Sequence, residues 1–208
     1  MSKRSTPSRG GTSFNRRDFL KGSGATVAAS AMAAGGVPTT AEAAIAQKQA
    51  VAGPTKVTLN VNGEDHEVTV EPRTSLLDVL RYDLNLTGCK DLEDVSVDGA
   101  DTVIIDGKAT YASTVLALQA RGKEIRTVES LRDGGQVDEV VSCFVKHDAM
   151  QCGYCTPGFV AATRAFLDKN PDASLEEIQQ GLGGNICRCG TYDGITRCAL
   201  ELTGKGGA

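Results

Sequence analysis

Two segments of the chain alternate apolar and polar residues, and a turn signal separates them. The alternation runs from Thr55 to Val61 and resumes over His66–Val70, with the dipeptide Asn62-Gly63 between the two segments. Successive side chains of a β-strand point to opposite faces, and Asn-Gly favours the left-handed backbone of a tight hairpin turn. The pattern therefore predicts a β-hairpin, which ends before Pro72.

Beyond this hairpin the spacing of apolar residues becomes helical. Thr74 or Ser75 can cap a helix at this point. The apolar face of this helix comprises Leu76, Leu77, Val79, Leu80 and Leu84. A further strand is predicted over Thr102–Ile105, closed by Asp106-Gly107, and a short one over Arg126–Glu129. A hairpin, a helix and then a strand follow one another in the order of a β-grasp domain.

After Asp133-Gly134-Gly135 the pattern changes to helices. Four are predicted, at 137–147, 156–168, 174–181 and 192–202. Thr156 is the expected cap of the second helix, Pro157 occupies its first position, and Ser174 opens the third with a capping box. In the first helix four residues are expected to face inward: Val140, Val141, Phe144 and Val145. These helices predict a bundle in the second half of the chain.

Together the elements predict an α+β fold made of two small domains. The expected β-grasp domain covers residues 55–130, and the expected helical domain covers residues 131–204. An Ala-, Gln- and Gly-rich stretch, residues 44–54, is interpreted as a linker that precedes both. Trp is absent and aromatic residues make up 4% of the chain, so the core must be mainly aliphatic.

The N-terminus has the order of features found in an export signal. Arg16-Arg17 precede the Ala- and Gly-rich segment Gly22–Val37, and Ala41-Glu42-Ala43 supplies small residues for cleavage. The apolar segment is too short and too weakly apolar to span a bilayer. We therefore expect residues 1–43 to be a twin-arginine signal peptide that directs the protein to the periplasm without a membrane span. The alternative is a disordered basic arm.

Removal of the signal makes the chain more acidic. Residues 1–43 hold six of the 22 basic and two of the 26 acidic residues, so the mature chain has a net charge of −8 at pH 7. Nucleic-acid binding requires clustered Lys and Arg, and this balance argues against it. The twin-arginine route exports folded proteins, which suits a cofactor that is inserted in the reducing cytosol.

The seven cysteines include two close pairs. Cys152 and Cys155 form C-x2-C directly before one predicted helix, and Cys187 and Cys189 form C-x-C before another. Helix N-termini stabilise thiolates, and four thiolates in two short loops suit an iron–sulfur cluster or a tetrahedral zinc ion. Disulfides are a third alternative, although one within C-x-C would be strained. The spacing favours a two-iron cluster and leaves zinc and disulfides open.

The segments around these cysteines resemble a known signature. QCGYCTPG at 151–158 and GNICRCGTYDGI at 184–195 are similar to the small iron–sulfur subunit of the xanthine dehydrogenase/aldehyde oxidoreductase family, and most of all to its exported periplasmic aldehyde oxidoreductase subunits. The resemblance implies a plant-ferredoxin-like domain followed by a four-helix domain. It also implies a large partner subunit that binds a molybdenum cofactor.

The same resemblance implies roles for individual residues. Cys152, Cys155, Cys187 and Cys189 would bind one [2Fe–2S] cluster in the helical domain. Gln151 and Cys189 would approach the molybdopterin that the partner subunit holds.

One loop departs from the family pattern. LTGCKDLEDVSVDGADTVIIDG at 86–107 keeps the frame that surrounds the family's first cluster. The ligand positions carry oxygen in place of sulfur: Glu93, Asp98, Asp101 and Ser113. Oxygen ligands suit iron–sulfur chemistry poorly, so the β-grasp domain is expected to lack a cluster. Calcium binding by this acidic loop is the alternative, and a solvated loop is favoured because an EF-hand arrangement is absent.

Three cysteines and two histidines lie outside these motifs. Cys143 and Cys198 lie on apolar helical stripes and are expected to be buried, whereas Cys89 has no assigned role. His66 and His147 have no partner constellation in the sequence, so surface or capping roles are expected for both.

The sequence thus predicts an electron-transfer subunit of a periplasmic molybdenum hydroxylase, whose partner oxidises an aldehyde or an N-heterocycle. Without a second cluster, transfer to a flavin would be long and slow, so we expect an acceptor that docks closer, such as a cytochrome domain. A zinc-binding docking or scaffold subunit without redox activity is the alternative. A free-standing ferredoxin is disfavoured by the helical domain.

Overall fold

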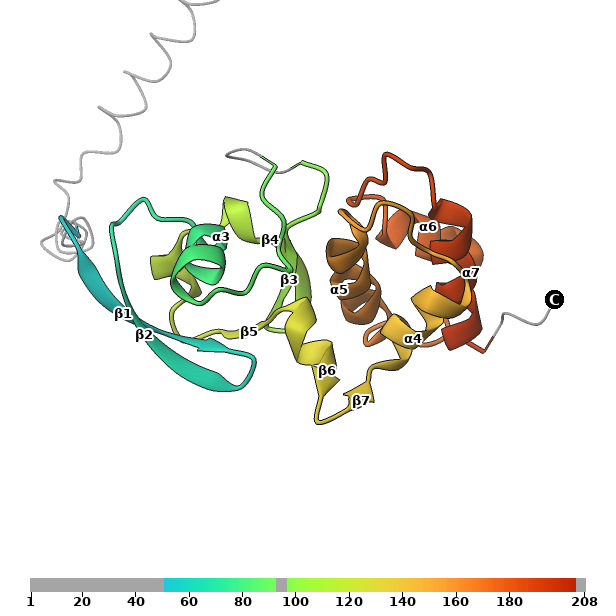
Figure 1. The fold of residues 1–208 in the computed structure, drawn as a ribbon, viewed down its shortest axis with the longest axis horizontal. Helices are drawn as coiled ribbons and strands as arrows, with labels where there is room; N and C mark the ends of the chain where they lie inside the picture. Colours follow the sequence, from blue (N-terminus) through green and yellow to red (C-terminus); the bar gives the residue numbers. More distant parts are fainter. Residues whose placement is uncertain (1–50, 93–96, 205–208) are drawn as a thin grey trace, which may run out of the picture. The chain divides into compact units, whose positions relative to one another are not determined.

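The computed structural model describes residues 51–92 and 97–204 (Figure 1). The predicted signal peptide, most of the predicted linker and Glu93 lie outside the described residues. Within them the elements form a sheet region, residues 55–126, followed by a helical region, residues 139–202. The combination of a mixed sheet and separate helices confirms the α+β class.

The sheet region contains five strands in the order β2-β1-β5-β3-β4. They are β1 (Thr55–Val61), β2 (Glu64–Val70), β3 (Thr102–Ile105), β4 (Lys108–Tyr111) and β5 (Glu124–Arg126). β1 and β2 form the predicted hairpin, with Asn62 at φ 55° and Gly63 at φ 84° in its turn. β5 pairs parallel to β1 and antiparallel to β3, so the last strand in the chain ties the hairpin to the rest of the sheet.

A helical turn contributes the other side of the sheet region's core. α3 (Leu76–Asp78) is capped by the Ser75 side chain and continues as a π-helical turn over Val79–Asp83. Leu76 and Leu80 are fully buried in a core shared with the strands. The strand residues of that core include Val57, Leu59, Val61, Val103 and Ile125. Burying each of these side chains contributes about 1.5–3 kcal/mol, so the predicted apolar face holds the turn in place.

One strand differs in position from the sequence prediction. The predicted strand over Arg126–Glu129 is misplaced in the sequence. The strand β5 ends at Arg126, and Val128–Leu131 form a 3-10 turn. Thr127 redirects the chain there. Its N–H donates to Asn62 Oδ1 at 2.8 Å, and its carbonyl accepts from the N–H of Ser130 at 3.1 Å.

A two-stranded ribbon, β6 (Arg132–Asp133) and β7 (Gln136–Val137), leads into the helical region. The four predicted helices are confirmed. They are α4 (Glu139–Lys146), α5 (Thr156–Leu167), α6 (Leu175–Gly181) and α7 (Tyr192–Leu202). Ser174 caps α6 with the predicted capping box, whereas Thr156 is the first residue of α5 and Cys155 is its cap.

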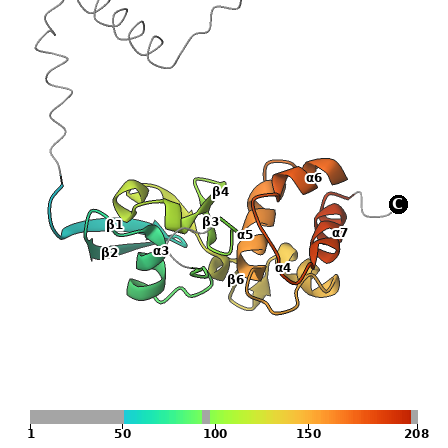
Figure 2. The ribbon, with the colours of Figure 1, turned by 90° about the horizontal axis from the view of Figure 1, so that it is seen from above.

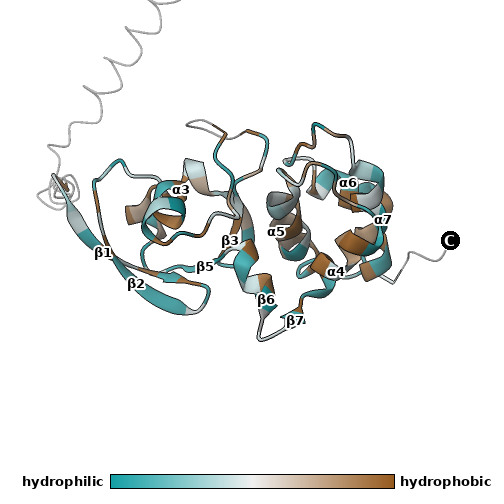
Figure 3. Cartoon of the chain, viewed as in Figure 1, coloured by the Kyte–Doolittle hydropathy of each residue, from teal (hydrophilic) through white to brown (hydrophobic). Residues whose placement is uncertain are grey.

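The buried face of α4 differs from the expected one. Val140 and Phe144 are buried as predicted, but Val145 is 67% exposed and Val141 is only partly buried. Cys143 faces inward with Val140 and Phe144, because residues three and four positions apart share one side of a helix. Figure 3 shows apolar colouring on the sides of α4, α5 and α7 that face one another.

α5 packs on β3 and β4 as well as on α4 and α7 (Figure 2). Ile104 of β3 and the small residues Ala161 and Ala165 of α5 form a small buried cluster between them. The approach is closest at Gly158, where an added Cβ would lie 2.1 Å from the carbonyl oxygen of Gly99. Only glycine therefore allows α5 to lie this close to the loop before β3.

A second link joins the loop before β3 to the segment before Cys187. Asn185 Nδ2 donates to the carbonyl of Gly99 at 2.9 Å and to Thr102 Oγ1 at 3.1 Å. The N–H of Ile186 donates to the carbonyl of Asp98 at 2.7 Å. Asn185 is 7% exposed, so its amide binds in a largely dry environment where lost hydrogen bonds are costly.

Candidate iron–sulfur centre

Two loops of the helical region carry the four cysteines of the predicted cluster site. Cys152 and Cys155 lie between α4 and α5, where Gly153 adopts φ 82°, a conformation that side chains disfavour. Cys187 and Cys189 lie between α6 and α7. Both loops run directly into the N-terminal end of a helix, where exposed N–H groups favour negative charge.

The structure brings the four thiols together as two pairs, each of which spans both loops. The thiols of Cys152 and Cys189 lie close enough to shift each other's pKa, and so do the thiols of Cys155 and Cys187. Cys187 is buried, Cys155 and Cys189 are half-buried, and Cys152 is exposed. Since the pairs form between the C-x2-C and C-x-C motifs rather than within them, neither loop completes a pair alone.

Hydrogen bonds concentrate on Cys187. Its Sγ lies 3.2 Å from Thr191 Oγ1, and its N–H donates to Tyr192 Oη at 2.8 Å. Burial raises the pKa of the Cys187 thiol, but hydrogen bonds from the Thr191 side chain and N–H, and then from Cys155, outweigh burial and lower the pKa to about 7. Burial, followed by the bond to Cys187, raises the pKa of Cys155 to about 12. Cys187 is therefore the more acidic thiol of this pair, and Cys155 is the less acidic one.

The pair of Cys152 and Cys189, called the outer thiol pair below, also contains one more acidic and one less acidic thiol. The backbone N–H of Tyr154, and then the Cys189 side chain, lower the pKa of the Cys152 thiol. The N–H of Cys152 acts to lower the pKa of Cys189, but donation of its thiol proton to Cys152, together with burial, raises it overall. Each pair thus contains one sulfur that is readily ionised and one that retains its proton, which metal binding must release.

This donor set fits a two-iron cluster. Four thiolates are the usual ligands of a [2Fe–2S] unit. A single tetrahedral zinc ion, with Zn–S bonds of about 2.3 Å, would place all four sulfurs about 3.8 Å apart. Among the residues that the structure describes, the only group of three or more His, Cys, Asp or Glu ligand atoms within 4.8 Å of one another is elsewhere, at Cys143, His147 and Glu201. Two separated thiol pairs match two metal ions better than one.

The oxygen-bearing positions of the sheet region bind the protein's own backbone. Asp98 Oδ1 accepts from the N–H of Ala100 at 2.8 Å, and Asp101 Oδ2 accepts from the N–H of Ser113 at 2.7 Å. Asp101 is fully buried, and its Oδ1 has no hydrogen-bond partner in the described part of the chain. Burial, with Glu129 and Asp101 nearby, raises the pKa of the Cys89 thiol to about 12, so this cysteine is a buried neutral group.

The expectations for the other cysteines and for His147 are confirmed only in part. Cys143 and Cys198 are 4% and 0% exposed, which confirms their predicted burial. His147 is the C-cap of α4, which confirms the expected capping role, but the expectation that it lacks a partner constellation is wrong, because its Nε2 lies 2.7 Å from Glu201 Oε2. Glu201 follows 54 residues later on α7, so no local spacing signals the contact.

Sequence reasoning also missed the residues that support the cysteine loops. Thr191 binds the Cys187 sulfur, and the Tyr192 ring contacts Phe159 edge-on, with ring centroids 6.1 Å apart. The only sequence signal for them was their position directly after the C-x-C motif. Gln151 is exposed beside Cys152, at the outer edge of the first loop.

Comparison with known families agrees with this geometry. Residues 127–200 match the [2Fe-2S] binding domain model, and residues 13–37 match the model of the twin-arginine translocation signal sequence. No helix in residues 51–92 or 97–204 has the length and apolarity needed to cross a membrane. The chain is therefore a [2Fe–2S] protein with a twin-arginine export signal for the periplasm.

Relatives cover most of the chain. The iron-sulfur-binding subunit PaoA of aldehyde oxidoreductase from Escherichia coli O157:H7 is 34% identical over 93% of this chain and 90% of its own length. The nicotine 6-hydroxylase small subunit of Paenarthrobacter nicotinovorans is 40% identical over 72% of this chain and 90% of its own. A chain of quinoline 2-oxidoreductase from Pseudomonas putida 86 superimposes with a TM-score of 0.69 at 35% identity, covering 74% of this chain and 96% of that one.

These relatives show which family of [2Fe–2S] proteins includes the chain. The chain belongs to the iron–sulfur subunits of the xanthine dehydrogenase/aldehyde oxidoreductase family, and it is accordingly a subunit of an oxidoreductase.

Proposed function

We propose that the protein is the electron-transfer subunit of a periplasmic molybdenum hydroxylase that oxidises an aldehyde or an N-heterocycle. The observation that carries the proposal is the arrangement of four thiols in two pairs, at the N-terminal ends of two helices. The names of the relatives supply the substrate classes, since nicotine and quinoline are N-heterocycles and PaoA belongs to an aldehyde oxidoreductase. A large partner subunit would hold the molybdenum cofactor and the substrate.

In this proposal Cys152, Cys155, Cys187 and Cys189 bind one [2Fe–2S] cluster. The bound cluster accepts and releases one electron at a time. Thr191 and the N–H groups of both loops donate hydrogen bonds to sulfur, and such bonds stabilise negative charge and raise a reduction potential. The chain's own residues therefore set how readily an electron is accepted.

The outer thiol pair lies on the side that we assign to the partner. Gln151 and Cys152 are exposed and Cys189 is half-buried, so Gln151 and Cys189 are accessible for the proposed contact with the partner's molybdopterin. Tyr154, Ile186 and Tyr192 in and beside the loops are 43%, 51% and 44% exposed. Exposed aromatic and apolar side chains of this kind are enriched at subunit interfaces.

The proposed domain arrangement gives one cluster to a protein with two domains. A β-grasp domain over 55–130 follows the 44–54 linker and lacks a cluster, and a four-helix domain over 131–204 binds the only one. Support comes from Asp98 and Asp101, whose carboxylates are engaged with backbone N–H groups. An acceptor then has to dock near the helical region, which suits a cytochrome domain better than a distant flavin.

Metal analysis of the purified periplasmic protein tests the proposal. We expect about two irons and two sulfides per chain, the visible absorption of a [2Fe–2S] cluster, and co-purification with a molybdenum-containing large subunit. About four irons would overturn the single-cluster assignment. A colourless protein with zinc in place of iron would select the docking or scaffold alternative.

A further inference from the structure

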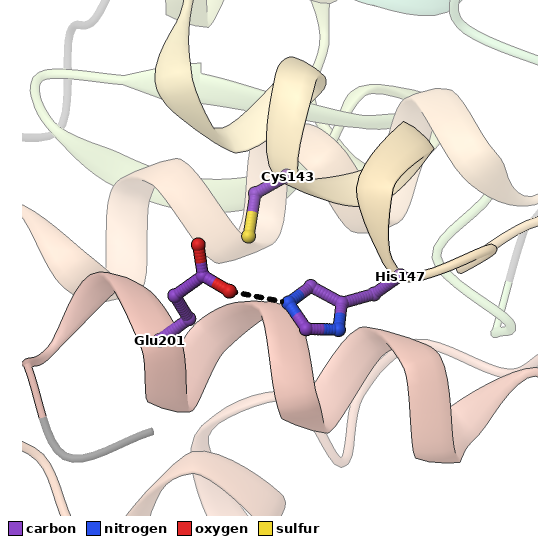
Figure 4. Close-up of side chains that lie close together, drawn as sticks. All are labelled: Cys143, His147 and Glu201. Carbon is purple, nitrogen blue, oxygen red and sulfur yellow. Dashed lines mark hydrogen bonds and ion pairs between the residues drawn. The ribbon is translucent and has the colours of Figure 1, made fainter. Parts of the chain in front are cut away.

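A second group of metal-ligand side chains lies at the C-terminal end of α4, outside the two cysteine loops. Ligand atoms of Cys143, His147 and Glu201 all lie within 4.8 Å of one another (Figure 4). Cys143 is on α4 and His147 is its C-cap, whereas Glu201 is on α7. The spacing of four residues places the first two on one face of α4. The group therefore joins two helices that are far apart in the sequence.

The three side chains converge on one point. His147 Nε2 lies 2.7 Å from Glu201 Oε2, and Figure 4 shows the Cys143 sulfur directed toward the gap between the ring and the carboxylate. Cys143 is 4% exposed, whereas the side chains of His147 and Glu201 are 20% and 38% exposed. A buried sulfur behind two partly exposed ligands leaves a path by which an ion enters from solvent.

We propose that Cys143, His147 and Glu201 bind a zinc ion at a site separate from the iron–sulfur cluster. Thiolate, imidazole and carboxylate are the three ligand types that zinc uses, with bonds of about 2.0–2.3 Å. Tetrahedral bonds of that length place ligand atoms about 3.3–3.8 Å apart, inside the observed spread. Magnesium and calcium prefer oxygen and would not select a site that contains a thiol. Water takes the fourth position.

The neighbours of the group are compatible with an ion. Lys146 Nζ lies 2.6 Å from Glu201 Oε1, which leaves Oε2 to replace its hydrogen bond to His147 by a bond to zinc. The zinc ion displaces the proton of the Cys143 thiol and binds the unprotonated Nε2 of His147. Binding therefore releases protons, and zinc affinity rises with pH.

The position of the group gives the ion a structural role. α4 leads into the loop that carries Cys152 and Cys155, and α7 begins directly after the loop of Cys187 and Cys189. The two segments already pack tightly, since a Cβ at Gly194 would lie 2.6 Å from the carbonyl oxygen of His147. A zinc ion would tether the same helices that position the iron ligands.

Zinc titration of the purified, cluster-loaded protein against a chromophoric chelator tests the site, with iron content and the visible spectrum recorded throughout. We expect one zinc per chain in addition to the iron. Cys143→Ser, His147→Ala and Glu201→Gln should each weaken zinc binding at least about 100-fold while iron is retained. Ser142→Ala on α4 and Arg197→Gln on α7 are matched controls, because the partners of these two exposed side chains, Asp138 and Asp193, are not ligands, and both variants should bind zinc as the wild type does.

Zinc K-edge absorption of the same sample identifies the ligands. The expected first shell contains one sulfur at about 2.3 Å and lighter atoms at about 2.0–2.1 Å. A shell of three or four sulfurs would place the zinc in the cysteine loops and overturn the proposal, as would binding that His147→Ala and Glu201→Gln leave unchanged. Because iron is measured independently, loss of the zinc site leaves the electron-transfer assignment intact, and loss of iron does not count against the zinc site.

Discussion

The loop before β3 and the two cysteine loops of the helical region stand at the two different places where the family pattern puts cluster ligands, and they carry different side chains. In the sheet region, Asp98 and Asp101 direct carboxylate oxygens onto backbone N–H groups of their own surroundings. In the helical region, the free thiols of Cys155 and Cys187 lie next to each other, and backbone N–H groups donate to the Cys187 sulfur. A carboxylate thus closes a loop on itself, whereas a pair of one acidic and one neutral thiol leaves sulfur available to a metal. The backbone frame and the ligand chemistry are separable properties.

The largest effect is expected from Cys187→Ser. The substitution removes the most readily ionised sulfur, which is one of the two sulfurs of the Cys155–Cys187 pair. The hydroxyl that replaces it is a poor ligand for iron in a cluster. Iron content and visible absorption should fall to near zero.

Cys89→Ala is the matched control, because Cys89 is equally buried but lies in the sheet region. This variant should keep its full iron content. Equal iron loss in both variants would contradict the assignment of the cluster to the helical region.

The comparison can also be reversed by returning sulfur to the sheet region. A variant with Glu93→Cys, Asp98→Cys, Asp101→Cys and Ser113→Cys should gain a second cluster, since β3, β4 and their turn keep the surrounding frame. Iron should rise from about two to about four per chain. The same four positions changed to Ser serve as the control, and an unchanged iron content in the Cys variant would show that the frame itself has been lost.

A smaller effect is expected where the two regions meet. Gly158→Ala would place a methyl group 2.1 Å from the carbonyl oxygen of Gly99, which forces α5 away from the sheet region. We expect a loss of about 1–3 kcal/mol in the free energy of unfolding, measured with denaturant. Gly183→Ala meets its nearest atom at 3.2 Å and should cost less. Equal losses would mean that the close contact with Gly99 does not limit packing.

The smallest effect concerns the pH dependence of Cys187. Its folded-state pKa of about 7 lies below its ordinary value of 9.0, so its thiolate stabilises the cluster-free fold fully above pH 9, and this contribution is lost as the pH falls through 7. Thr191→Val removes a hydrogen bond that lowers this pKa. Ultraviolet thiolate absorbance of the cluster-free chain should then appear at higher pH than in the wild type. An unchanged titration would exclude Thr191 as the cause of the low pKa.

Much of the fold followed from local signals. The Asn62-Gly63 turn, the Ser174 capping box and the limits of α7 could be predicted because each depends on residues that are close in the sequence. The position of β5 could not, because Thr127 is redirected by Asn62 from 65 residues away. The exposure of Val145 depends on where α7 and α5 lie, which periodicity alone does not specify.

In the candidate site, too, local features could be predicted and long-range contacts could not. The two cysteine motifs are local and were visible in the sequence, but the pairing of Cys152 with Cys189 and of Cys155 with Cys187 arises only when two loops meet. The contact of His147 with Glu201 escaped for the same reason. Contacts between side chains that are far apart in the sequence produce no local spacing pattern from which they could be predicted.

The side-chain amide of Asn185 links the two regions. It binds the segment before Cys187 to Gly99 and Thr102 of the sheet region. The proposed iron ligand Cys187 is thereby held in place by Asn185, a neighbour that supplies no thiol to the centre. Residues 127–200, excised alone, would lose that brace and should hold iron poorly. The working redox unit is consequently larger than the stretch of chain that touches the metal.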